Sequence, residues 1–203
     1  MHAARISFFH IIKSKERRMI VKYIMLSINP PYAEMIINEK KPVEFRKKVL
    51  NAIKNFYKDS DDIHFYIYET KRKGGRGKVI GEADMAWMHK LSYNISPGPE
   101  HFSHQLAKER NNFIQWLYYF WCAQTGKKPN PKEGWFRSSR FSKYMEEIGF
   151  QTDCDYAVWL CKPKAFEIPV DISEFSYENG TSILRPPQGM CYCLQKQTNT
   201  LKN

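Results

Sequence analysis

The sequence has no long hydrophobic segment. Nowhere in its 203 residues does an apolar run approach the roughly 20 consecutive residues that a membrane-spanning helix needs. The sequence therefore predicts a soluble protein with no membrane partner.

The sequence also lacks the usual metal and redox signatures. Its five cysteines are odd in number and show no Cys-x-x-Cys spacing, which favours reduced thiols and a cytoplasmic location. Cys191 and Cys193 would share one face of a strand, but two ligands do not make a zinc site. The six histidines show no paired ligand spacing, and no Ser–His–Asp or Cys–His arrangement can be located. We therefore expect no metal or other cofactor.

Positive charge, in contrast, is in excess. The chain has 32 Lys and Arg against 21 Asp and Glu, a net charge of +11. Such a balance suggests an anionic partner, of which nucleic acid is the commonest. Nearly half of the excess lies in residues 1–24, however, and many soluble domains are as basic as the remainder.

The two ends are expected to lie outside the folded domain. In residues 1–22, the apolar run Ile6–Ile12 precedes the basic cluster Lys13–Arg18, which is the reverse of the order in a signal peptide. We expect an unstructured extension or a mis-assigned start, since Met19 and Met25 are alternative starts. A basic arm that contacts RNA is the sharper alternative. Residues 196–203 are expected to form a polar tail.

Hydrophobic periodicity predicts an α+β domain over residues 23–195. The expected strands are Tyr23–Ile28, Lys41–Arg46, Ile63–Thr70, Val79–Trp87, Ala157–Lys162, Ala165–Val170 and Met190–Leu194. An early helix is expected after Pro31, over Tyr32–Asn38. A helical insertion is expected at about 97–150, with one helix that ends near Gly126 and a second over about Ser139–Ile148. This order favours a small, mostly antiparallel β-barrel with an early helix and a helical insertion.

The segment Lys41-Pro-Val-Glu44-Phe-Arg46 is the most informative stretch. In an extended strand, Val43 and Phe45 face one way while Glu44 and Arg46 face the other. Lys41 has the wrong parity for the charged face, so it can reach Glu44 only from the turn before the strand. The three charges form either a structural ion pair, worth little to stability, or the floor of a polar binding site.

Several motifs, taken in order, resemble those of ASCH-domain proteins, a branch of the PUA-like superfamily. They are Met25-Leu-Ser-Ile28, Tyr32-Ala-Glu34, Lys41-x-x-Glu44-x-Arg46, Tyr68, Val79-Ile-Gly-Glu82, Phe141-x-x-Tyr144, Tyr156-Ala157 and Arg185-Pro-Pro-Gln188 before Tyr192. The family signature begins with a glycine where this chain has Glu39. The turn before Lys41 therefore cannot rely on glycine's freedom at positive φ.

This resemblance implies a cleft lined by the signature strand and a role in RNA binding, in translation or in transcription. Some family members look like amidohydrolases acting on acetylated cytidine, and others are associated with RNA cleavage. The amidohydrolase branch has threonine, the presumed nucleophile, at the position of Glu44, so that mechanism is not transferred. A glutamate between Lys41 and Arg46 would stay ionised, and it suits accepting hydrogen bonds better than acting as a base.

The leading hypothesis is a nucleic-acid-binding protein, with RNA favoured over DNA, that binds through a basic cleft. The sequence leaves the oligomeric state open, and a monomer is favoured. Lys41, Glu44 and Arg46 would contact bases or phosphates, and a basic turn would follow the nucleic-acid backbone. The remaining candidate ligands are Lys71, Arg72, Lys73, Arg76 and Lys78 in that turn, together with Arg185 and Gln188 before the last strand. The turn may be read equally as a solvated hairpin loop, and Arg185 and Gln188 as a cap on the barrel rim. The alternative function is a hydrolase acting on a modified nucleoside or on RNA, with Lys41 and Glu44 in the chemistry.

Aromatic residues concentrate in the insertion. Trp116, Tyr118, Tyr119 and Trp121 make one helix apolar on more than one face, which favours a helix buried on two sides. An exposed remainder could stack bases or meet a partner protein. Trp135-Phe-Arg137, with Arg140 and Lys143 nearby, mixes aromatic and basic groups as RNA-binding surfaces do, although it could equally anchor a linker.

Overall fold

The computed structural model describes residues 20–56, 62–91, 100–129, 139–150 and 154–196, with side chains of the helix at 100–125 described from residue 112 onward. The expected N-terminal extension lies almost entirely outside these residues, as do Trp135-Phe-Arg137 and all but the first residue of the expected tail. The elements in chain order are β1 (Val21–Ile28), α1 (Tyr32–Ile37), β2 (Val43–Arg46), α2 (Asn51–Lys54), β3 (Asp62–Glu69), η1 (Arg72–Gly74), β4 (Lys78–Lys90), α4 (Glu100–Thr125), α5 (Ser139–Glu147), β5 (Tyr156–Val170), η3 (Ile172–Glu174), β6 (Phe175–Ser176), β7 (Met190–Tyr192) and β8 (Leu194–Gln195), where η marks a short 3₁₀ helix.

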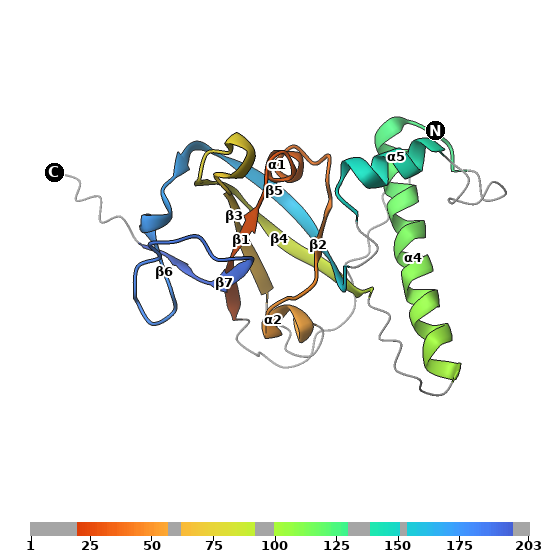
Figure 1. The fold of residues 1–203 in the computed structure, drawn as a ribbon, viewed down its shortest axis with the longest axis horizontal. Helices are drawn as coiled ribbons and strands as arrows, with labels where there is room; N and C mark the ends of the chain where they lie inside the picture. The colour runs from red at the N-terminus through yellow and green to blue at the C-terminus, as the bar shows by residue number, and fades with distance from the viewer. Residues whose placement is uncertain (1–19, 57–61, 92–99, 130–138, 151–153, 197–203) are drawn as a thin grey trace.

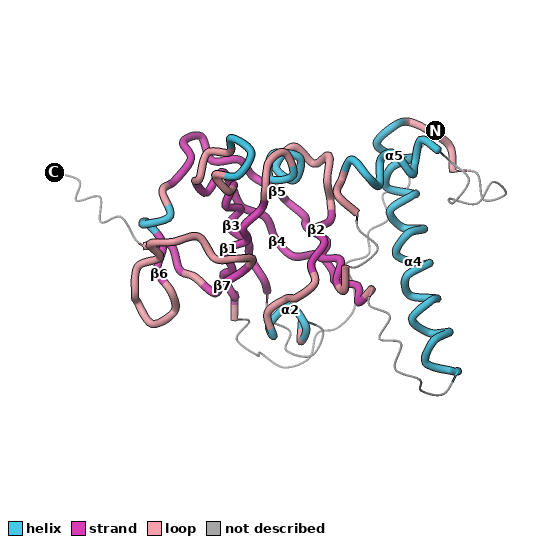
Figure 2. Tube along the Cα trace, in the orientation of Figure 1, coloured by secondary structure: helices cyan, strands magenta, loops and turns pink. Residues whose placement is uncertain are grey.

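One six-stranded sheet forms the centre of the molecule (Figures 1 and 2). Its strand order is β2-β5-β4-β3-β1-β7, and only the pair β1–β3 is parallel among these neighbours. The sheet curls into a partial barrel, which brings the edge strand β2 close to β1. Arg46 of β2 accordingly donates a hydrogen bond from Nη2 to the carbonyl of Ser27 in β1, at 2.6 Å. The predicted α+β class, the mostly antiparallel sheet, the early helix and the helical insertion are confirmed.

The prediction of two separate strands over 157–162 and 165–170 is wrong. A single strand, β5, runs through both, with a register shift between the pairs Glu82–Lys164 and Asp84–Cys161. Lys162 takes a φ of 49° at this irregularity. Pro163 is tolerated there because a residue at a bulge need not donate to a neighbouring strand.

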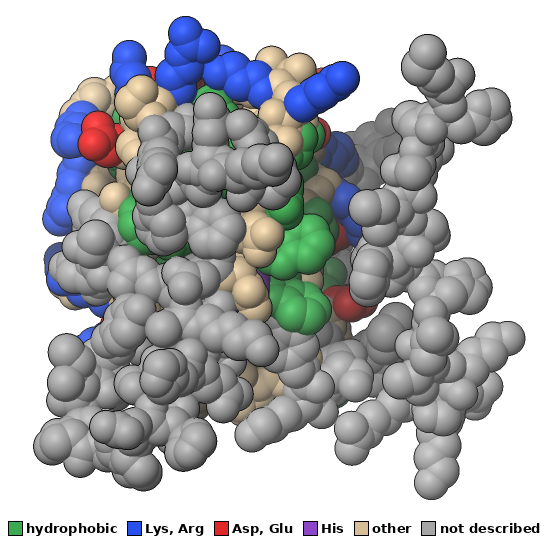
Figure 3. All heavy atoms as spheres, turned by 90° about the vertical axis from the view of Figure 1, so that its right-hand side faces the viewer, with side chains coloured by type: hydrophobic (Ala, Val, Ile, Leu, Met, Phe, Trp, Pro, Cys, Tyr) green, Lys and Arg blue, Asp and Glu red, His purple; other side chains and the backbone are tan. Residues whose placement is uncertain are grey.

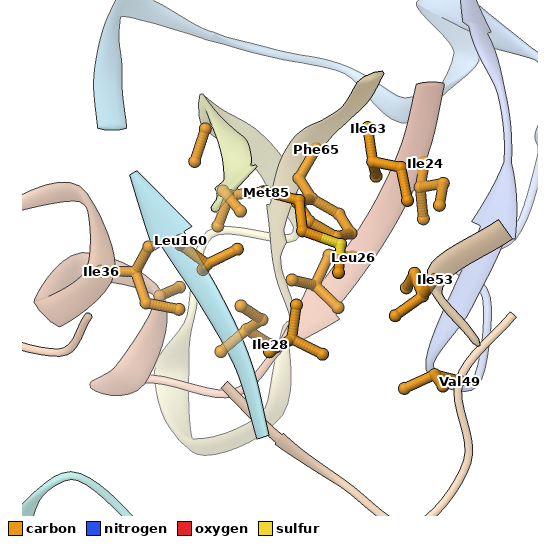
Figure 4. Packing of buried hydrophobic residues seen from close by; sticks show 14 of the residues in the cluster. Ile24, Leu26, Ile28, Ile36, Val49, Ile53, Ile63, Phe65, Met85 and Leu160 are labelled. Atoms are coloured by element: carbon orange, nitrogen blue, oxygen red, sulfur yellow. The ribbon is translucent and has the colours of Figure 1, made fainter. Parts of the chain in front are cut away.

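Both faces of β1 are covered, which explains its nearly continuous apolar sequence. Ile24, Leu26 and Ile28 point into the main core, together with residues of α1, β3 and β4 (Figure 4). Met25 faces the opposite way, into a smaller core that includes Phe175 and the segment around η3.

The insertion packs against the edge of the sheet formed by β2 and β5. Val43 and Phe45 of β2 are buried in a third core with α4 and α5. On α4, one stripe is buried, consisting of Phe113, Ile114, Leu117, Tyr118, Trp121 and Cys122. Trp116 is 61% exposed and Tyr119 is 38% exposed. The expectation of a helix buried on two sides is therefore wrong for these two side chains.

Candidate functional site

The three charges of the signature strand come together as predicted, in what we call the β2 cluster (Lys41, Glu44 and Arg46). Since Val43 and Phe45 are buried in the core with α4 and α5, Glu44 and Arg46 project from the opposite face of β2. Lys41 reaches Glu44 from the turn before the strand, with Nζ 3.5 Å from Oε2. The parity argument made from the sequence is thus confirmed.

Lys41 is one of the most deeply buried side chains, at 2% exposure. Its ammonium donates to the carbonyl of Ile148, just beyond α5, and lies 4.6 Å from the ring centre of Phe45 and 5.2 Å from that of Tyr32. Burial lowers the pKa of Lys41, and the neighbouring Glu44 only partly offsets this effect. Lys41 therefore fastens the insertion to β2 as well as completing the charge cluster.

The turn before Lys41 contains a residue in the left-handed region. Glu39 has a φ of 58°, a conformation that glycine adopts more easily than any other residue. The following amides are satisfied, since the backbone N–H groups of Lys40 and Lys41 both donate to the carbonyl of Met35. The turn keeps its conformation although it carries a glutamate.

Arg46 is held from two directions but keeps unused donors. Its Nη2 lies 3.0 Å from Glu44 Oε1 and 2.6 Å from the carbonyl oxygen of Ser27. Its Nε is buried without a hydrogen-bond partner, and the same is true of the Ser27 hydroxyl, in the part of the chain that the structure describes. Buried donors of this kind are costly unless a bound molecule satisfies them.

The β2 cluster opens into a concavity of about 180 Å³, which we call the central hollow. Its walls also include Ser27, Ile28, Asn29, Tyr32, Phe45, Gly149 and Cys154. Lys41, Glu44 and Arg46 therefore line a concavity and do not point only into bulk water. The hollow is smaller than the roughly 300–1,000 Å³ of drug-sized sites, so it suits one flat group of a larger ligand.

The predicted basic turn divides into an anchored and a free part. Arg76 forms ion pairs with Glu34 and with the buried Glu69, and its backbone N–H donates to Glu69 Oε2 at 2.8 Å. The free part consists of four exposed cations, Lys71, Arg72, Lys73 and Lys78. At the base of the turn, Thr70 donates to Asn29 Oδ1 at 2.7 Å, so the turn adjoins the rim of the central hollow.

The other two predicted ligands are exposed in the loop that leads into β7. Gln188 lines a second concavity together with Arg46, whereas Arg185 is not among the lining residues. We call this concavity the basic hollow; it has a volume of about 380 Å³ and is bounded by Arg46, Lys47, Lys48, Val49, Leu50, Gln188, Gly189 and Met190. The structure therefore brings Gln188 close to the β2 cluster.

Several residues that line these hollows were not predicted as ligands from the sequence. Ser27, Asn29 and Tyr32 line the central hollow, and Lys48 lines the basic hollow. One available signal was the polar Ser27 inside the apolar run of β1, since a polar residue in a buried strand usually needs a partner. The sequence contained no such signal for Lys48, because the position of this residue depends on the path of the chain after β2.

A third, apolar concavity lies between the insertion and the sheet. It measures about 550 Å³ and is lined by Ala86, Trp87, His89, Trp116, Phe120 and Trp159. Burial lowers the pKa of His89 to about 4, so its ring is neutral near pH 7. On the side of the molecule shown in Figure 3, hydrophobic side chains lie exposed below a row of Lys and Arg side chains. Among the described residues, the lining of this apolar concavity contains no Lys, Arg, Asp or Glu.

The described residues contain no group of three or more His, Cys, Asp or Glu side chains arranged to hold a metal ion. No helix among them is long and apolar enough to cross a membrane.

The sequence matches no family model and no curated protein. Among solved structures, it is similar to the ASCH protein from Zymomonas mobilis, with 20% identity, a TM-score of 0.42 and coverage of 86% of this chain and 89% of that chain. Two point mutants of the Zymomonas mobilis protein give 19% identity and a TM-score of 0.41, with coverage of 86% of this chain and 89% or 91% of theirs. The similarity is one of fold.

Proposed function

We propose that this protein binds single-stranded nucleic acid, with RNA as the preferred form, and holds one base in the central hollow. The observation that carries the proposal is the state of Arg46. Glu44 and the Ser27 carbonyl fix its guanidinium beside the hollow, yet its Nε and the nearby Ser27 hydroxyl have no partner within the described chain. A base edge offers the acceptors that such donors need.

The rest of the hollow suits the same ligand. Tyr32 adds an aromatic ring to its wall, and stacking on an aromatic ring favours any base, whatever its sequence. Glu44 can accept from an exocyclic amine, although Lys41 and Arg46 already occupy much of its capacity. The hollow thus combines donors, an acceptor and a ring in a space for one planar group.

The basic turn supports binding of a strand. Lys71, Arg72, Lys73 and Lys78 are exposed next to the rim of the central hollow, where they can neutralise phosphates without reading sequence. Binding should accordingly weaken steeply as salt is raised. A role in translation or transcription is part of this proposal through the ASCH resemblance.

One observation favours the alternative, a hydrolase acting on a modified nucleoside such as acetylated cytidine, or on RNA. Lys41 is buried, has a lowered pKa and adjoins Glu44, and such lysines can serve as bases or nucleophiles. The hydrogen bond from Lys41 to the Ile148 carbonyl, however, gives this lysine a structural role that is independent of catalysis. Incubation with acetylated cytidine and with RNA, followed by product analysis, distinguishes the two functions. New products that Glu44→Gln abolishes while the fold persists would favour the hydrolase.

The binding proposal is tested by fluorescence anisotropy with a labelled short RNA at low salt. Arg46→Gln should weaken binding by about 1–3 kcal/mol, because a fixed donor is lost. Lys54→Gln, which removes an exposed lysine of α2 that lines neither hollow, is the control and should have little effect. Equal affinity of these two variants would contradict the proposal.

Ser27→Ala covers the case in which Arg46→Gln disturbs the fold. The Ser27 hydroxyl has no hydrogen-bond partner in the described structure, so its removal should leave the free energy of unfolding unchanged or slightly raised. It should still weaken RNA binding if a base occupies the hollow. An unchanged affinity for RNA would argue against a ligand at this position.

A further inference from the structure

The basic hollow lies beside the central hollow, and Arg46 lines both. Among the described residues, its lining includes three consecutive cations, Arg46, Lys47 and Lys48, and no Asp or Glu. Lys48 is exposed and has no ion-pair partner among the described residues. A concavity bordered by Arg46 and an exposed lysine suits an anion.

Arg46 divides its donors between the two hollows. Its Nη2 is used on the side of Glu44 and Ser27. Its Nη1 lies on the side of Gly189, where a β-carbon added to that glycine would stand 3.8 Å from it. Gly189 lines the basic hollow, so Nη1 borders that hollow.

The loop around Gly189 forms the wall of the basic hollow opposite Arg46, and a backbone hydrogen bond holds it in place. Ser27 donates its N–H to the carbonyl of Gly189 at 2.8 Å, which ties the loop before β7 to the strand that also lines the central hollow. Because position 189 is glycine, no side chain enters the space in front of Nη1. The loop thereby leaves room for a tetrahedral group between Arg46 and the lysines.

We propose that the basic hollow binds the phosphate attached to the nucleotide whose base occupies the central hollow. This inference rests on the proposed function and narrows it, since the site would take a nucleotide within a strand in preference to a free nucleoside. A guanidinium held in place by Glu44 binds phosphate oxygens through directed hydrogen bonds, and Lys48 adds a mobile point charge. Val49, Leu50 and Met190 supply an apolar wall for the adjoining sugar.

Isothermal titration with four probes tests this assignment: inorganic phosphate, a nucleoside, its 5′-monophosphate and a trinucleotide containing the same base. The trinucleotide and the monophosphate should bind more tightly than the nucleoside, and inorganic phosphate alone should bind weakly. Lys48→Ala should weaken binding of both phosphorylated nucleotides several-fold and reduce the dependence on salt by about one phosphate contact. It should leave nucleoside binding unchanged.

Two further variants separate a site from a general charge effect. Gly189→Val keeps the net charge but fills the space beside Arg46 Nη1, so it should weaken binding of the phosphorylated probes as Lys48→Ala does. Lys54→Ala removes an exposed lysine of α2 that does not line the hollow, so it should match the unmodified protein. Circular dichroism verifies the fold of each variant.

The outcomes distinguish this inference from the function on which it rests. If Arg46→Gln weakens binding while Lys48→Ala and Gly189→Val behave like Lys54→Ala, the phosphate assignment is wrong and the central-hollow site stands. Equal affinity for the nucleoside and the trinucleotide would overturn the assignment in the same way. If no nucleoside or nucleotide binds at all, the proposed function and this inference both fail.

Discussion

The β2 cluster and the basic turn both contain Lys and Arg side chains but hold them differently. In the β2 cluster, Lys41 is 2% exposed and Glu44 is 8% exposed, and every charge is within ion-pair distance of another. In the turn, Lys71, Arg72, Lys73 and Lys78 are exposed, whereas Arg76 forms ion pairs with two carboxylates. A buried side chain with partners holds its charged group in one orientation, whereas an exposed side chain can move its charged group to meet a ligand.

This difference separates two contributions to binding. A guanidinium held as Arg46 is can discriminate among ligands, because its donors point at fixed positions. Mobile cations on a turn add affinity that is independent of sequence and sensitive to salt. Single substitutions can show whether the β2 cluster and the basic turn differ as sharply in stability and in binding as they do in burial.

Lys41→Met should produce the largest effect on stability. The substitution leaves Glu44 buried without its ammonium partner and the Ile148 carbonyl without its donor. Removing one partner of a buried pair typically costs about 3–5 kcal/mol. Urea denaturation measures the loss, and Lys40→Met, at the neighbouring exposed position, should change stability by less than about 0.5 kcal/mol. A loss as small as that of the control would show that Lys41 does not fasten the insertion to β2.

Arg76→Ala should cost about 1–3 kcal/mol of unfolding free energy, because it removes a cation from the buried Glu69. The remaining backbone N–H of residue 76 still donates to Glu69, which keeps the cost below that at Lys41. Arg72→Ala, in the exposed part of the same turn, is the control and should be nearly neutral. Equal denaturation midpoints for the two variants would remove the distinction between the anchored and the free part of the turn.

The sequence was enough to predict the elements that alternate strongly. Glu44, Arg46 and their apolar neighbours follow a period of two, so the parity of β2 and the approach of Lys41 from the preceding turn could be read directly. The hairpin of β3 and β4 was predicted for the same reason, from two alternating runs separated by a glycine-rich turn. Local periodicity carries this information because it depends only on neighbouring residues.

Long-range contacts could not be read in this way. The Ile148 carbonyl lies 107 residues from Lys41, and Lys48 meets Gly189 at the basic hollow only because the sheet curls. The parallel pairing of β1 with β3 and the continuity of β5 through Pro163 likewise depend on which strands meet. From the sequence, Arg76 could not be distinguished from the other four cations of the basic turn, because its partners Glu34 and Glu69 come from two separate elements.

Glu39→Gly should stabilise the protein by up to about 1 kcal/mol. It relieves a left-handed backbone conformation at φ 58°, although glycine's greater freedom in the unfolded chain offsets part of the gain. Lys40→Gly is the matched control, because position 40 does not have a positive φ, and it should destabilise the protein. Thermal denaturation measures both changes, and a lower midpoint for Glu39→Gly would mean that the glutamate side chain makes a compensating contact.

Lys73→Ala should have the smallest effect and completes the contrast with Lys41. The side chain is exposed, so its removal should change the free energy of unfolding by no more than about 0.5 kcal/mol. If the turn follows a nucleic-acid backbone, the variant should lose affinity for RNA equally across sequences, and the slope of log affinity against log salt should fall by about one contact. Anisotropy titrations of two unrelated RNAs at several salt concentrations measure both quantities. A loss restricted to one RNA would assign Lys73 to base recognition, and the division between a directed cluster and a sequence-independent turn would then be wrong.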